Sequence, residues 1–229
     1  MIDLVIIILV LFFSIIGYYR GFIKTVMTLL ASVAALVLSF LVYPAVNGFL
    51  KMTPLYTYMN QWIEKRIAHI EFGTGIQTQG NVISENITWI PKILSEQIIK
   101  NNNAEVYKVL EVANVKEYVS IYLTNMIIGI ASILVIWLIL KLLITFFLTT
   151  THSIVSHTPV LSSINKLGGM LVGTAKGVLG IWIICLLVPV FINYDFFAQI
   201  NEAVSSSYLA RWLYENNMII IAFKYIFSI

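Results

Sequence analysis

The three histidines and the single cysteine are the residues of this sequence best suited to bind a metal or to act as nucleophiles. A zinc-binding helix uses histidines four residues apart, usually with an acid between them, whereas His152 and His157 are five apart and enclose no acid. The third, His69, is far away in the sequence. Cys185 lies in an apolar run, where a thiol ionises poorly and acts as a small apolar filler. This pattern predicts no metal site, no cofactor and no catalytic residue, and therefore a protein that is not an enzyme.

Two lysines are the next candidates, because a charged group inside a membrane is costly and often functional. Lys141 and Lys176 each interrupt an otherwise apolar run. Both lie near the expected cytoplasmic ends of their runs, so we favour side chains that extend to the membrane surface over a functional role. A channel would need charges or polar rings deeper in the membrane.

Small residues recur at helical spacing in two of the apolar runs. Gly169, Gly173 and Gly177 occupy every fourth position and therefore share one helix face. In lipid, such a face lets another helix approach closely. The expected partner is the second strip of small residues, Ser32, Ala35 and Ser39. We favour packing within one chain; oligomerisation, with a pore as its extreme form, is the alternative.

The composition indicates the environment in which these residues act. The 229-residue chain is 59% hydrophobic and 11% charged, whereas soluble domains average about 25% charged residues. So many apolar residues cannot be hidden in one soluble core, which indicates a membrane protein. The formal charge of +3 is too small to indicate a nucleic-acid partner.

Four apolar runs, residues 2–17, 22–46, 119–148 and 168–192, approach the length needed to cross a bilayer. Lipid offers no partners for backbone groups, so each run must be helical. The predicted fold class is therefore all-α, a polytopic membrane protein with four transmembrane helices. The predicted segments are 1–48, with the first two helices, 49–118, an extracytoplasmic helical loop, 119–192, with the last two helices, and 193–229, an extracytoplasmic amphipathic helix.

Basic residues on the short connections predict the orientation. Arg20 and Lys24 lie between the first two runs, and Lys166 lies between the last two. Lysine and arginine near short loops mark the cytoplasmic side. We therefore expect a multi-pass protein of the bacterial cytoplasmic membrane with both termini extracytoplasmic; enrichment in Ile, Asn, Lys, Tyr and Phe is typical of an A/T-rich bacterial genome.

The two extracytoplasmic segments show helical patterns of their own. In the long loop we expect helices over 54–70, from Pro91 and around Val106, with a loop at 71–81. Asn114 followed by Glu117 predicts a capping box. The last 25 residues, 205–229, carry an apolar stripe that predicts one helix on the membrane surface: Leu209, Trp212, Leu213, Ile220, Phe223 and Phe227.

Two segments carry a pattern that resembles the CvpA (colicin V production protein) family. The first is the turn between the first two runs, preceded by an acid, with Asp3, Gly17, Tyr18, Arg20, Gly21 and Phe22. The second opens the fourth run with Asn165, Lys166 and Gly168, and continues through the glycine strip to Lys176. The order and spacing of the two segments agree with the family along almost the whole membrane part, although the outer loop is longer than in short members.

The resemblance implies a small multispanning membrane protein without known catalytic residues. It links the chain to colicin V or toxin production and secretion and to envelope maintenance. We therefore expect a non-enzymatic accessory or scaffold protein whose partners are the lipid bilayer and other envelope or secretion proteins, with homo-oligomerisation left open. The alternative is a small oligomeric membrane pore or transporter built through the glycines of the fourth run.

Overall fold

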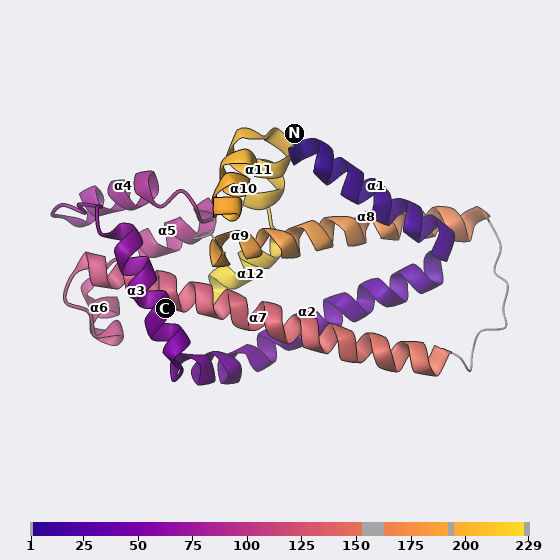
Figure 1. Ribbon diagram of the computed structural model, residues 1–229, viewed down its shortest axis with the longest axis horizontal. Helices are drawn as coiled ribbons and strands as arrows, with labels where there is room; N and C mark the ends of the chain where they lie inside the picture. Colours follow the sequence, from indigo (N-terminus) through magenta and orange to yellow (C-terminus); the bar gives the residue numbers. More distant parts are fainter. Residues whose placement is uncertain (1, 153–162, 192–194, 227–229) are drawn as a thin grey trace. The chain divides into compact units, whose positions relative to one another are not determined.

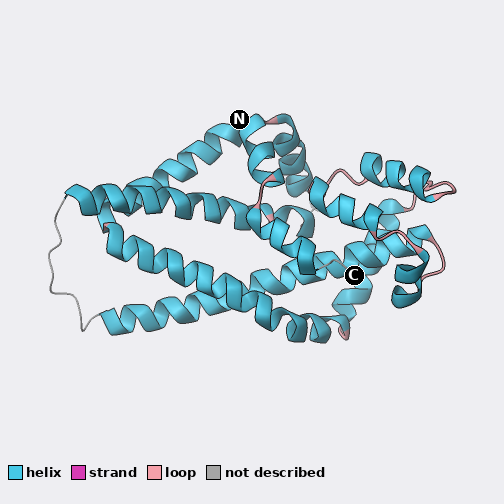
Figure 2. Cartoon of the chain, turned by 180° about the vertical axis from the view of Figure 1, so that it is seen from behind, coloured by secondary structure: helices cyan, strands magenta, loops and turns pink. Residues whose placement is uncertain are grey.

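The computed structural model describes residues 2–152, 163–191 and 195–226. Within these residues every regular element is a helix and no strand occurs (Figure 2). Four helices are long and apolar enough to cross a membrane: α1 (Ile2–Arg20), α2 (Phe22–Lys51), α7 (Val115–His152) and α8 (Ser163–Cys185). The all-α, four-span fold class predicted from the sequence is therefore confirmed.

Helix α8 ends earlier than the apolar run that contains it. The candidate span runs to Val190, two residues before the expected end, but α8 stops within it at Cys185 and a short helix, α9 (Leu187–Val190), completes it. Pro189 has no N–H to donate to the carbonyl of Cys185 four residues before it, so the helical ladder is interrupted there. The residues on both sides of this break are apolar, so hydropathy alone did not reveal where α8 ends.

The chain forms two compact units. Unit 1 comprises Met1–Ala45 and Ser132–Ile184, and unit 2 comprises Val46–Ala131 and Cys185–Ile229. The segments predicted from the sequence ended at residues 48, 118 and 192, where hydropathy changes. The compact units instead divide α2 and α7 along their lengths, because tertiary contacts rather than hydropathy define them.

In unit 1, α1 and α2 are joined by a single residue. Gly21 has φ +77°, a left-handed conformation that favours glycine. Its N–H donates to the carbonyl of Gly17 at 2.9 Å, and its own carbonyl accepts from Thr25 N–H at 3.1 Å. One glycine thus ends α1 and begins α2, so the chain reverses without a loop.

Unit 2 contains four helices in the long connection between α2 and α7: α3 (Pro54–Ile67), α4 (Ile76–Asn86), α5 (Lys92–Lys100) and α6 (Ala104–Leu110). Helix α4 was not expected, because its Gly- and Gln-containing sequence indicated a loop at 71–81. The chain is instead helical from Ile76. Gly80 is buried, and its missing side chain leaves room for Ile99. Ile63, Ile83 and Ile98 are fully buried and form part of a core shared by these helices.

The amino terminus of α7 carries the predicted cap. Glu117 N–H donates to the Asn114 side chain at 3.0 Å, and the Glu117 carboxylate accepts from Ala113 N–H at 2.8 Å. These reciprocal bonds satisfy backbone donors at the start of the helix. Helix α7 therefore begins at Val115, before the apolar run that the sequence predicted from residue 119.

The C-terminal segment differs from the single surface helix that was expected. It forms three helices, α10 (Asp195–Ser206), α11 (Tyr208–Glu215) and α12 (Met218–Ile226). Asn217 separates the last two and caps α12, accepting from Ile219 N–H at 3.0 Å. Ile220 and Phe223 are buried, and α12 packs against α5, so much of the apolar stripe belongs to the core of unit 2. Phe227, the last residue of that stripe, lies outside the described residues.

Candidate functional site

The two sequence segments that carry the family pattern meet at the turn between α1 and α2. The Asn165 side-chain oxygen accepts a hydrogen bond from Phe22 N–H at 2.9 Å, although the residues are 143 positions apart. This bond satisfies one of the unpaired donors at the start of α2. A Cβ at Gly168 would lie 2.9 Å from a ring carbon of Phe22. We call this cluster of Gly17, Gly21, Phe22, Asn165 and Gly168 the α1–α2 joint.

The glycine strip of α8 packs against α1 within unit 1. Gly169, Gly173 and Gly177 are all buried. A Cβ at Gly173 would lie 3.1 Å from Gly17 Cα, and a Cβ at Gly177 would lie 3.2 Å from Val10 Cα. The two backbones therefore touch, and Figure 1 shows α1 and α8 side by side near the joint.

This contact corrects the partner expected for the glycine strip. Ser32, Ala35 and Ser39 of α2 are buried, but the contact recorded for this strip is with α7: Trp137 Nε1 donates to the Ser32 carbonyl at 3.3 Å. The atoms nearest to the glycines belong to α1 and to Gly21, the residue that ends it. The sequence predicted a role for Gly17 only in the turn. The structure shows that the missing side chain of Gly17 also gives α1 the flat surface against which α8 packs.

The remaining residues of the family pattern lie at different places on α1. Tyr18 has the Lys166 ammonium 5.8 Å from its ring centroid, beside the joint. Arg20 is the exposed last residue of α1. Asp3 lies in the first turn of the helix, about 26 Å from Arg20 along the helix axis. The structure therefore brings Tyr18 to the joint but not Asp3.

Both lysines that interrupt apolar runs contact partners inside unit 1. The Lys176 ammonium donates to Thr28 Oγ1 of α2 at 3.1 Å. The Lys141 ammonium lies 4.4 Å from the centroid of the Trp137 ring on its own helix. Both lysines are half-buried, and their head groups take part in contacts between or along helices.

No group of three or more His, Cys, Asp or Glu side chains that could hold a metal occurs in the described part of the chain. His69 lines a cavity in unit 2. The side chain of His152 and the whole of His157 lie outside what the structure describes. Cys185 is a free thiol at the end of α8.

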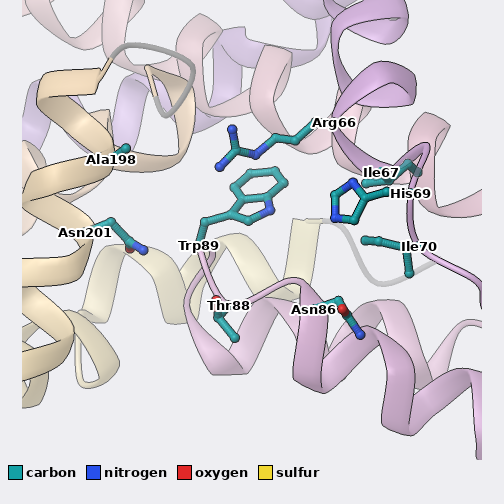
Figure 3. Close-up of a pocket in the computed structure, with 9 residues that line it drawn as sticks. All are labelled: Arg66, Ile67, His69, Ile70, Asn86, Thr88, Trp89, Ala198 and Asn201. Atoms are coloured by element: carbon teal, nitrogen blue, oxygen red, sulfur yellow. The ribbon is translucent and has the colours of Figure 1, made fainter.

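A cavity of about 430 Å³ opens in unit 2 beside the end of α3. Figure 3 shows the Arg66 side chain extended over the Trp89 ring, with Asn201 of α10 on the other side of the cavity. Arg66 Cζ lies 5.5 Å from the Trp62 ring centroid and 5.6 Å from that of Trp89. Burial lowers the pKa of Arg66, but arginine stays protonated at neutral pH. The aromatic contacts hold its planar donor group in place.

A second cavity in unit 2, of about 500 Å³, shares Thr88 and Asn201 with the first. Its lining carries charges of both signs, including Lys92, Glu96 and Arg211. We call the two cavities together the unit 2 recess. Amide, hydroxyl and charged groups in this arrangement can bind a polar protein segment.

The sequence reading did not single out the residues of the unit 2 recess. Trp62 and Arg66 are four residues apart on a predicted helix, so their contact could have been anticipated. Trp89 and Asn201 come from distant segments, and nothing in their local sequence indicates that they line one cavity with Arg66. Only the folding of unit 2 brings them together.

Comparison with known proteins gives one family. Searches of curated proteins and of solved structures return no match to the chain. A family model described as colicin V production protein matches residues 2–89 and 105–217, which covers α1 to α4 and most of α6 to α11. Together with the four membrane-spanning helices and the joint formed by the two motif segments, this match shows that the chain is a multi-pass membrane protein of the colicin V production protein family.

Proposed function

We propose that this protein is a non-enzymatic accessory or scaffold protein of the bacterial cytoplasmic membrane that serves toxin production or secretion and envelope maintenance. Unit 1 anchors the protein in the bilayer, and unit 2 binds an envelope or secretion protein. The observation that carries the proposal is the unit 2 recess, where Arg66 contacts two indole rings beside polar side chains.

The folded core of unit 2 and the groups that line its recess support a role in protein binding. Helices α3 to α6 and α10 to α12 have a core of fully buried apolar residues, as a folded domain does. Such a body presents its recess with fixed geometry, which reduces the entropic cost of binding. The adjoining cavities offer donors, acceptors and an aromatic surface, all of which are enriched at protein interfaces.

The arrangement of the chain supports placing unit 2 outside the cytoplasm. With four spans, the end of α2, the start of α7 and the end of α8 lie on one side of the membrane, and unit 2 gathers the segments attached to them. The opposite side carries Arg20, Lys24 and Lys166 on or beside the short connections. By the positive-inside rule that side is cytoplasmic, so both termini are extracytoplasmic.

A cysteine-labelling experiment tests this orientation. In a Cys185→Ser background, Gln77→Cys in α4 should react with a membrane-impermeant thiol reagent in intact cells. Ser163→Cys, at the start of α8, should react only after the membrane is opened. Both positions are exposed within their units, so reversed labelling would contradict the orientation.

The glycine strip lends little support to a pore built by oligomerisation. Gly169 and Gly173 contact α1 of the same chain, so this face is already occupied within one molecule. Reconstituted in liposomes, the protein should leave ion permeability unchanged. A protein-dependent ion flux would instead favour the pore or transporter.

Photo-crosslinking in intact cells tests the docking role directly. A photoreactive amino acid at Thr88, which lines both cavities, should capture a discrete set of envelope proteins. The same residue at Val109, which is exposed on α6 and lines neither cavity, is the matched control. Arg66→Ala should reduce capture at Thr88 about tenfold, since arginine anchors commonly contribute this much at interfaces. Equal capture from both positions would refute the proposed surface.

A further inference from the structure

One face of α2 receives a polar group from each of two other helices in unit 1. Thr28 Oγ1 accepts a hydrogen bond from Lys176 of α8 at 3.1 Å. One turn further along α2, the carbonyl of Ser32 accepts from Trp137 of α7 at 3.3 Å. These two bonds fix the register of α7 and α8 against α2.

This register places Lys141 at the level of Thr28. Figure 1 shows α2 and α7 running in opposite directions. Because Trp137 is level with Ser32, the residue one turn later on α7, Lys141, is level with the residue one turn earlier on α2. Lys141 and Lys176 therefore both approach the stretch of α2 from Thr28 to Ser32, one from α7 and one from α8.

The same end of unit 1 carries a third cation. Arg20 is the exposed last residue of α1 and lies two residues before the start of α2. The sequence contains no Asp or Glu between residues 4 and 63, or between residues 118 and 194. Asp3 is therefore the one carboxylate of unit 1, and it lies at the opposite end of α1 from Arg20.

Three neighbouring cations without a carboxylate are unfavourable in a membrane. Their mutual repulsion is strong where the dielectric constant is low, and a buried charge needs an opposite charge to offset its lost hydration. Thr28 supplies only a hydroxyl, and Trp137 only the face of a ring. An anion from outside the chain is the group that would balance the cluster.

The depth of the cluster points to the source of this anion. Thr28 is six residues beyond the start of α2, about 9 Å along the helix axis. The headgroup layer of each leaflet is about 5–7 Å thick, and a lysine head group can reach several ångströms towards the surface. The half-buried ammonium groups are thus within reach of lipid phosphates.

We propose that Arg20, Lys141 and Lys176 bind the phosphate of an anionic phospholipid from the leaflet that surrounds the α1–α2 joint. The lipid phosphate supplies the negative charge that unit 1 lacks and links α1, α7 and α8 around α2. This site lies in unit 1 and is independent of the docking role proposed for unit 2.

The test uses the full-length protein in a mild detergent and native mass spectrometry with phosphatidylglycerol. Wild-type protein should retain the lipid, whereas Lys141→Gln/Lys176→Gln should lower its affinity about tenfold or more, as expected for the loss of charge-assisted hydrogen bonds. The matched control is Lys24→Gln/Lys166→Gln, which removes the same charge from the same end of unit 1 and leaves the three cations in place. The control should bind the lipid like the wild type.

Three further outcomes are decisive. Equal losses in the two double variants would show a general surface attraction and overturn the site. Equally tight binding of phosphatidylcholine would also overturn it, because net negative charge would not matter. If inorganic phosphate at millimolar concentration displaces the lipid fully, the cluster is a site for free phosphate and the lipid assignment fails. Should the double variant not yield monodisperse protein, Lys141→Gln alone should show the same selective loss in a smaller amount.

Discussion

Units 1 and 2 differ in the size of the side chains that they bury most completely. In unit 1 the buried positions of α1 are Ile6, Ser14 and Gly17, while Leu4 is 62% exposed and Ile8 is 55% exposed. The largest fully buried side chains, such as Ile63 and Phe223, lie in unit 2. Lipid solvates apolar side chains, so helices in a bilayer associate through small residues and polar contacts. Unit 2 instead buries large apolar side chains, whose removal from water stabilises a fold.

The hydrogen bonds between helices also differ between unit 1 and unit 2. In unit 2 the Asn60 side-chain oxygen accepts from Ser120 Oγ at 3.0 Å and from Thr124 Oγ1 at 3.1 Å, and Tyr118 Oη donates to the Ile98 carbonyl at 2.7 Å. These bonds tie α3 and α5 to α7. In unit 1 Thr174 donates to Ser14 at 3.1 Å, where α8 lies along α1. Unit 2 thus places hydrogen bonds around a core of large apolar side chains, and unit 1 places them beside the close backbone contacts of α1 and α8.

The largest expected effect concerns the apolar core of unit 2. Phe223→Ala should lower the free energy of unfolding by about 4 kcal/mol, because it leaves a cavity beside α5. Trp212→Ala is the control, since Trp212 is 53% exposed, and it should cost about 1 kcal/mol or less. Denaturant titration of the detergent-solubilised protein measures both. Similar losses would mean that the C-terminal segment lies on the membrane surface after all.

The next effect concerns the close approach of backbones in unit 1. Gly173→Ala places a methyl group 3.1 Å from Gly17 Cα and against the Phe13 carbonyl, and should destabilise the protein by about 3 kcal/mol. Gly180→Ala makes the same chemical change, but its Cβ would lie 4.0 Å from the Phe13 ring. Since alanine favours helix more than glycine does, this control should be neutral or stabilising. Thermal unfolding in detergent distinguishes them, and equal melting temperatures would refute the α1–α8 contact.

A smaller effect is expected for the polar network of unit 2. Tyr118→Phe removes the donor to the Ile98 carbonyl and leaves a buried acceptor unsatisfied, which should cost about 2 kcal/mol. Tyr208→Phe, at a position that is 87% exposed, should have no measurable effect. Denaturant midpoints of the two variants give the comparison. If both match the wild type, the network contributes specificity without stability.

The smallest effect is expected at the α1–α2 joint. Asn165→Ala removes the acceptor for Phe22 N–H and should cost about 1 kcal/mol, the usual value of a helix cap. Asn165→Asp keeps an acceptor oxygen and should recover most of this loss. Hydrogen exchange at the start of α2 reports the bond directly. Unchanged exchange in Asn165→Ala would show that water replaces the side chain at no cost.

Local sequence patterns predicted which helices form better than they predicted which helices contact each other. The four spans, the helices that begin at Pro54 and near Pro91, and the cap formed by Asn114 and Glu117 all rest on residues close together in the sequence, whose effects act within one helix. Helix α4 was missed because glycine and glutamine are weak helix signals, and tertiary burial of Gly80 against α5 outweighs them. The C-terminal stripe was recognised, but an amphipathic pattern is the same for a helix that faces lipid and for one that faces a protein core.

The sequence by itself determined that this protein crosses the membrane, because four long apolar runs and the lack of interior carboxylates leave no other stable arrangement. It also marked Gly17, Gly21, Asn165 and the α8 glycines as unusual. Only the tertiary structure decided that Asn165 caps α2, that the glycines face α1 rather than α2, and that Arg66 meets Trp89. The physical reason is that spacing reveals which residues share a helix face, whereas packing in three dimensions decides which face lies opposite.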